Sequence, residues 1–98
     1  MSLSGNWISK DHKFNLEVKN ELEGDYPIII TMPVVKEPVN GVLKNGQVAN
    51  LSFEVNDKPV YVYLFVNQVS DDQIEVRGTG RSTGRFKGDI PETVFYRN

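Results

Sequence analysis

Residues that could support catalysis are few in this chain of 98 residues, and their spacing does not suit it. The single histidine, His12, lies between Asp11 and Lys13 in an expected turn, which is a poor setting for a Ser-His-Asp triad. The absence of cysteine excludes disulfides, thiolate metal sites and cysteine nucleophiles, and one histidine is too few for a multi-histidine metal site. We therefore predict that the chain is not an enzyme and uses no cofactor or metal.

The carboxylates also indicate a solvated surface rather than an acid–base pair. Glu17, Glu54 and Glu75 occupy the polar phase of alternating segments, so they should face water. Glycoside chemistry would instead need inward carboxyl groups of unequal pKa. The adjacent Asp71 and Asp72 fall in an expected turn and lack the spacing of a calcium loop.

The most distinctive polar feature is a glycine-rich basic segment, residues 77–88 (RGTGRSTGRFKG). It has no acidic residue and a net charge of +4, which leaves −6 for the rest of the chain and −2 in total. It lacks the Gly-Lys-[Ser/Thr] of a phosphate loop, and no helical pattern follows it. We expect residues 80–91 to form an open loop, because Gly80, Gly84 and Gly88 should interrupt a β ladder. Its four cations are Arg77, Arg81, Arg85 and Lys87.

The longest apolar run, residues 60–66, is far shorter than the ~18–20 residues of a membrane helix. In a strand it would be apolar on both faces, with Tyr61, Tyr63 and Phe65 on one of them. These aromatic side chains could bind a ligand or stack on bases or sugars. They could also be covered by a second copy of the chain, so we predict a homodimer.

Alternation of apolar and polar residues dominates the rest of the chain, and no helical period is present. Asn-Gly dipeptides at 40–41 and 45–46, and polar clusters near 56–58 and 70–72, are typical of turns. Three prolines in residues 26–40 predict a sheet edge, a bulge or an irregular stretch there. We expect strands near 5–10, 13–20, 26–32, 39–44, 47–56, 59–69, 73–79 and 92–97.

These patterns predict a single all-β domain over residues 1–98, an antiparallel meander of about eight strands closed or nearly closed into a barrel. Its interior should hold its own side chains or one small ligand. The 39% apolar and 24% charged residues suit such a globular domain. The predicted core comprises Trp7, Phe14, Leu16, Val18, Leu51, Phe53, Val55, Val62, Leu64, Ile74, Val76 and one face of residues 94–96.

Both ends of the chain resemble the calycin superfamily of lipocalin-like and avidin-like barrels. The resemblance rests on Gly5-Asn6-Trp7 in the first strand and on Arg97 in the last. It implies that Trp7 packs across the closed end of the barrel and that Arg97 lies over its indole. Lipocalins are usually half as long again and carry a C-terminal helix and often a disulfide. This chain lacks these features, and it is more similar to the small bacterial lipocalin-like barrels.

Three functions follow as alternatives. The first is a non-enzymatic lipocalin-like barrel that binds a small apolar ligand or a peptide. The second is a proteinaceous inhibitor or interaction module that presents the basic segment 77–91 to a protein partner, a role that some small lipocalin-like barrels of bacteria have. The third is an anion or nucleic-acid binder using the same segment, although the acidic remainder disfavours nucleic acid.

The start of the sequence, Met-Ser-Leu-Ser-Gly, has neither a charged nor an apolar region typical of a signal peptide. We expect no membrane association and a cytoplasmic protein by default. A secreted or periplasmic location would follow if a signal peptide preceded these residues.

Overall fold

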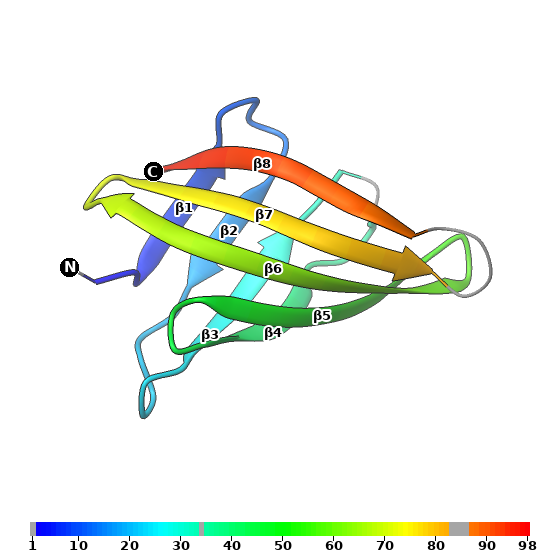
Figure 1. The fold of residues 1–98 in the computed structure, drawn as a ribbon, viewed down its shortest axis with the longest axis horizontal. Helices are drawn as coiled ribbons and strands as arrows, with labels where there is room; N and C mark the ends of the chain where they lie inside the picture. The colour runs from blue at the N-terminus through cyan, green and yellow to red at the C-terminus, as the bar shows by residue number, and fades with distance from the viewer. Residues whose placement is uncertain (1, 34, 83–86) are drawn as a thin grey trace.

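A computed structural model describes residues 2–33, 35–82 and 87–98 of the chain. It contains eight antiparallel strands and, within those ranges, no helix (Figure 1). The strands are β1 (Gly5–Ser9), β2 (Asn15–Val18), β3 (Tyr26–Thr31), β4 (Val39–Lys44), β5 (Val48–Val55), β6 (Lys58–Ser70), β7 (Gln73–Ser82) and β8 (Lys87–Arg97).

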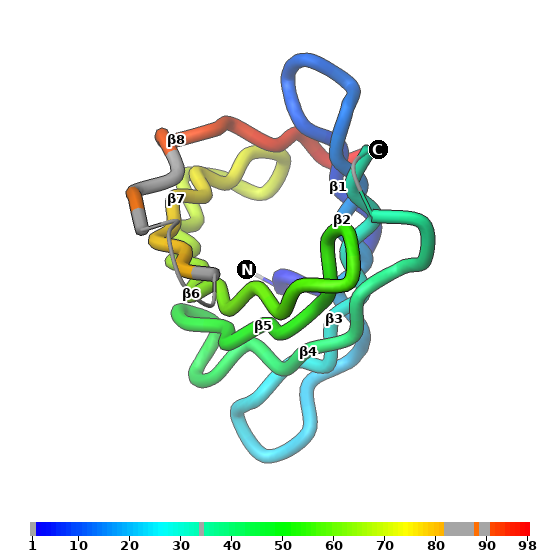
Figure 2. Tube along the Cα trace, turned by 90° about the vertical axis from the view of Figure 1, so that its right-hand side faces the viewer, coloured from blue at the N-terminus to red at the C-terminus, as the bar shows by residue number. Residues whose placement is uncertain are grey.

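The strands form a closed barrel in which each pairs with the next along the chain. Closure comes from β8, which pairs with β1 from Trp7↔Arg97 to Ser9↔Phe95. Figure 2 shows the strands arranged around a common centre, with β1 beside β8. The predicted fold, an all-β meander closed into a barrel, is confirmed.

Turns with positive φ connect several of the hairpins. Asn45 and Gly46 have φ of 54° and 68°, and Asn56 and Asp57 have φ of 52° and 63°. Positive φ at both central residues matches the twist of the flanking strands, and asparagine, aspartate and glycine tolerate it best. The expected turn at residues 40–41 is wrong, because Asn40 and Gly41 lie within β4.

The core follows the predicted alternation, with differences near the strand ends. Phe14, Phe53 and Val55 are half-buried rather than buried. Phe14 and Val55 lie at or just outside the end of a strand, and Phe53 lies in the part of β5 that has no pair in β4. Phe95 is the buried face of residues 94–96. The other predicted core residues are buried. The core also contains residues outside that prediction, namely Leu3, Ile28, Ile30, Val39, Leu43, Ala49 and Val66.

The open loop expected over residues 80–91 is wrong for the residues that the structure describes. β7 continues to Ser82 and β8 begins at Lys87, so both strands enter this region. They are paired there, and their ladder includes Gly80↔Gly88 and Arg81↔Lys87. The ladder is interrupted only by a register shift between Val76 and Gly78. Gly78 and Gly80 are buried beside Leu64 and Val62 of β6, where the missing side chains leave room for those larger neighbours.

The ladder between β4 and β5 is short. It contains Leu43↔Ala49 and Lys44↔Val48, whereas β3 pairs with β4 from residue 39 and β5 pairs with β6 as far as Val55. Residues 39–42 of β4 therefore form no pair with β5, and the two strands diverge toward the start of β4. The proline-rich stretch was predicted to be an edge or irregular, and residues 32–38 outside β3 and β4 are indeed irregular where described.

Candidate functional site

One end of the barrel is closed by Trp7. Its side chain is 1% exposed, and its indole Nε1 donates a hydrogen bond to the Leu3 carbonyl at 2.9 Å. The guanidinium carbon of Arg97 lies 4.3 Å from the indole centroid, within the range of a cation–π contact. The contact that the sequence predicted between Arg97 and Trp7 is confirmed.

Arg97 also joins segments from both ends of the chain. Its Nε donates to the Asp71 carbonyl at 2.7 Å, Nη1 to the Ser4 carbonyl at 2.7 Å and Nη2 to the Ser2 carbonyl at 2.9 Å. The Nε atom lies 3.9 Å from the carboxylate of Asp72, which is exposed, so that ion pair contributes little. The planar guanidinium is therefore held by hydrogen bonds from the N–H groups at its edge and by the indole against its face.

Gly5 is required by the same arrangement. Its φ is +135°, and a Cβ atom at this position would lie 2.6 Å from Nη1 of Arg97. Any other residue would displace the arginine as well as strain the backbone. The Gly-x-Trp pattern is thus explained by the space that Arg97 occupies.

The opposite end of the barrel has an apolar pocket of about 90 Å³. Arg97 contacts the turn between β6 and β7, which places the end of β6 at the closed end of the barrel. The opposite end is therefore the one where the end of β5 pairs with the start of β6. Thr93 is the only lining residue with a polar side chain. The pocket, here called the mouth, is lined by Phe14, Ile30, Met32, Leu51, Phe53, Val62, Leu64, Val76, Thr93 and Phe95.

Tyr61, Tyr63 and Phe65 point away from the mouth, on the outer face of β6. The two tyrosines are 46% and 49% exposed. Alternation places these three opposite the buried Val62, Leu64 and Val66, so a ligand that they bind would lie on the outer face of the barrel. The predicted core residues Val62 and Leu64 already implied this outward orientation.

The outer face does bring together predicted residues from two segments. The register of β6 and β7 sets Tyr61 opposite Arg81 and Phe65 opposite Arg77. The Arg77 guanidinium carbon lies 5.6 Å from the centroid of the Phe65 ring. We call these four residues and Tyr63 the aromatic–arginine face. Of the other predicted cations, Arg85 and the side chain of Lys87 lie outside the described residues.

Two carboxyl groups adjoin this face. The protonated carboxyl of Glu92 can donate a hydrogen bond to the Glu75 carboxylate, and this bond and the negative charge of Glu75 raise the pKa of Glu92, while the nearby Arg77 opposes that shift. Glu17 and Glu54 are exposed, as predicted, and Glu75 is partly exposed. None of them forms a carboxylate pair inside the barrel.

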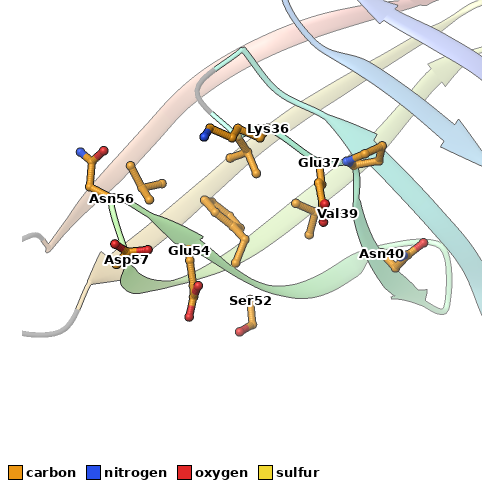
Figure 3. Close-up of a pocket in the computed structure, with 12 residues that line it drawn as sticks. Lys36, Glu37, Val39, Asn40, Ser52, Glu54, Asn56 and Asp57 are labelled. Carbon is orange, nitrogen blue, oxygen red and sulfur yellow. The ribbon is translucent and has the colours of Figure 1, made fainter.

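A third feature is a groove of about 770 Å³ where β4 and β5 diverge. It is lined by residues 35–40 and 52–57, and Figure 3 shows Ser52 and Glu54 pointing to the same side of β5. Phe53 lines both this groove and the mouth. The sequence contained no signal for the groove, since it results from two strands that fail to pair. The position of Phe14 and Phe53 beside turns was the one available signal for the mouth.

Within the ranges that the structure covers, no group of three or more histidine, cysteine, aspartate or glutamate side chains is placed to hold a metal ion. No helix of the described part is long and apolar enough to span a membrane. Comparison of the chain with protein-family models, with curated proteins and with solved structures finds no match.

Proposed function

We propose that this protein is a non-enzymatic binding barrel whose mouth takes a small apolar group, either from a peptide or from a small ligand. The observation that supports it is the asymmetry of the barrel. One end is filled by Trp7 and hydrogen-bonded around Arg97, while the other has an apolar pocket. Sites for small molecules are typically concave and mostly apolar, as the mouth is.

The volume of the mouth limits the ligand. Apolar cavities of roughly 150 Å³ hold one benzene molecule, and the mouth is smaller, at about 90 Å³. It therefore suits an aliphatic side chain or the end of an alkyl chain. The rest of such a ligand would lie outside the barrel. The likeness of Gly5, Trp7 and Arg97 to the calycin pattern supports the same proposal by analogy of fold alone.

A titration with hexanoate and with N-acetyl-leucine amide, followed by amide NMR, tests this function. We expect shifts at Phe14, Phe53 and Thr93 and none at Trp7. Thr93→Phe should abolish them, because Thr93 is half-buried in the lining and a ring there fills the mouth without compressing the core. Glu92→Phe is the matched control, since it adds the same ring to the exposed neighbouring position.

A second candidate function is an interaction module that uses the aromatic–arginine face. Its support is the register that sets exposed tyrosines beside Arg77 and Arg81. Aromatic and arginine side chains are enriched in interfaces, and a second copy of the chain is the partner we propose. Light scattering should give a dimer mass that falls to a monomer in Tyr61→Ser with Tyr63→Ser. A monomeric wild type at high concentration would contradict it.

The same face also retains the anion-binding alternative. Salt-dependent retention of the wild type on heparin, lost in Arg77→Ala with Arg81→Ala, would assign the face to an anion instead. The melting temperature should stay nearly unchanged in that variant, because both arginines are exposed.

A further inference from the structure

We propose that the groove between β4 and β5 binds an extended, basic peptide segment, which adds to the free edge of β5 as a strand. This site shares Phe53 with the mouth but does not depend on the binding of an apolar group there. Three observations carry it: the short β4–β5 ladder, the direction of the free backbone groups of β5, and the charge of the groove.

The first observation is an unpaired edge within a closed barrel. β5 pairs with β6 over its whole length, yet only Val48 and Ala49 pair with β4. The described residues of β4 from Val39 to Val42 pair with β3 alone. At Gly41 the two strands are still close, because the Leu51 side chain occupies the space where a Cβ atom on Gly41 would lie, and the Asn50 carbonyl oxygen is 3.8 Å from that position. The open part of the β5 edge therefore begins at Ser52, the first β5 residue that lines the groove. An edge of this kind is a ready template for another strand.

The second observation is the direction of the free backbone groups. The amide of Val66 donates to the Gln47 carbonyl at 2.8 Å, which makes these residues a hydrogen-bonded pair in the β5–β6 register. Hydrogen-bonded pairs alternate along an antiparallel ladder, so odd-numbered residues of β5 bond to β6. The N–H and C=O groups of Ser52 and Glu54 therefore point toward β4, into the groove.

The third observation is charge. Glu37, Glu54 and Asp57 line the groove, and Lys36 is the one cation among the lining residues that the structure describes, so these four residues sum to a net charge of −2. Figure 3 shows these residues at the rim, around the gap between the two strands. Complementary charge favours encounter with a basic segment and disfavours an acidic one.

Apolar lining residues complete the site. Val35, Phe53 and Val55 are half-buried and line the groove beside its charged rim. An added strand directs alternate side chains to opposite faces. We therefore expect the bound peptide to alternate basic residues, facing the rim, with small apolar residues facing Phe53 and Val55.

The probe is a set of fluorescent nine-residue peptides in which lysine alternates with valine or threonine, measured by anisotropy at two salt concentrations. We expect binding that weakens as the salt concentration rises. Two control sets keep the protein unchanged. One replaces lysine by glutamate, and the other carries N-methyl groups on alternate backbone nitrogens, which removes donors for strand pairing.

Ser52→Pro is the decisive variant. It removes an N–H that faces the groove but no bond to β6, and proline is tolerated at such positions of edge strands. We expect binding to weaken by about tenfold or more, with Ser52→Thr as the matched control. Glu54→Lys with Asp57→Lys tests the charge without altering the backbone. If Ser52→Pro does not fold, the N-methylated peptides still test strand addition.

Four outcomes would overturn the proposal. They are no binding of the lysine peptides up to about 1 mM, equal binding of the glutamate set, equal binding of the N-methylated set, or full binding to a folded Ser52→Pro variant. The mouth is judged separately, because Thr93→Phe should leave peptide binding unchanged. If the wild type binds the lysine peptides but not hexanoate, the proposal for the groove stands and the proposal of an apolar ligand at the mouth fails.

Discussion

The two ends of this barrel are built by different forces. At the closed end, Arg97 lies over Trp7, and its three donor nitrogens bond to carbonyl groups of the N-terminal segment and of the turn between β6 and β7. At the mouth, Phe14 and Phe53 are half-buried and lie over a lining of buried apolar side chains. Directed contacts define one geometry, whereas apolar contacts at an open end leave room for a guest. The comparison predicts that stability resides at the first end and binding at the second.

Trp7→Ala should have the largest effect. A buried aromatic side chain truncated to alanine costs about 3–5 kcal/mol, which can unfold a domain whose total stability is about 5–15 kcal/mol. A urea titration followed by circular dichroism measures the loss. If the midpoint barely moves, Trp7 does not hold the closed end together, and the contrast between the ends fails.

Arg97→Lys should follow, with a loss of about 2–3 kcal/mol. Lysine keeps the charge over the indole but cannot reach three carbonyl groups in a fixed plane. The same urea titration applies, with Lys10→Ala as an exposed control. Equal stability of the lysine variant would mean that charge alone, and not the planar guanidinium, matters at this end.

Phe53→Ala should cost about 1–2 kcal/mol, because its side chain is only half-buried and truncation there opens onto solvent. The same substitution should also alter hexanoate binding at the mouth, because Phe53 lines it. Trp7 variants that still fold should bind hexanoate as the wild type does. A loss as large as that of Trp7→Ala would contradict the proposed difference between the two ends.

Asp11→Asn should change the pH dependence of stability near the mouth. The Ser9 hydroxyl, at 2.6 Å, and the Lys13 amide, at 3.0 Å, both donate to the carboxylate and hold the pKa of Asp11 below its ordinary value of 3.8. A carboxyl group whose pKa is lower in the folded than in the unfolded protein stabilises the fold at pH values above its unfolded-state pKa. That contribution is lost as the pH falls through its folded-state pKa. Urea midpoints from pH 6 to pH 2 should therefore fall less steeply in Asp11→Asn. Parallel curves would show that this turn is not linked to protonation.

Tyr61→Ala should have the smallest effect on stability. The side chain is 46% exposed on the outer face and supports neither end of the barrel. At protein concentrations where the chain is monomeric, the melting temperature should stay within about 2 °C of the wild type. A larger drop would show that the outer face contributes to the core.

Much of the fold could be predicted because alternation is a local signal. Leu16, Val18, Ile74 and Val76 show which face of each strand is buried, whatever the strand pairs with. Glycine misled the prediction for residues 80–91, since a glycine-rich segment is a poor strand in isolation. Gly78 and Gly80 are tolerated because β6 and β8 supply backbone partners on both sides of β7.

The candidate sites, like the fold, have features that the sequence predicted and features that only the structure revealed. The sequence by itself determined that Tyr61 and Tyr63 share a face, that Trp7 and Arg97 meet, and that the chain forms a small β-barrel. Only the tertiary structure decided that Arg77 and Arg81 stand beside the aromatic row, that β7 and β8 stay paired at Gly80 and Gly88, and that β4 residues 39–42 form no pair with β5. The physical reason is that alternation fixes the two faces of a strand, but which face is interior, and which neighbour it keeps, depends on how the whole sheet closes.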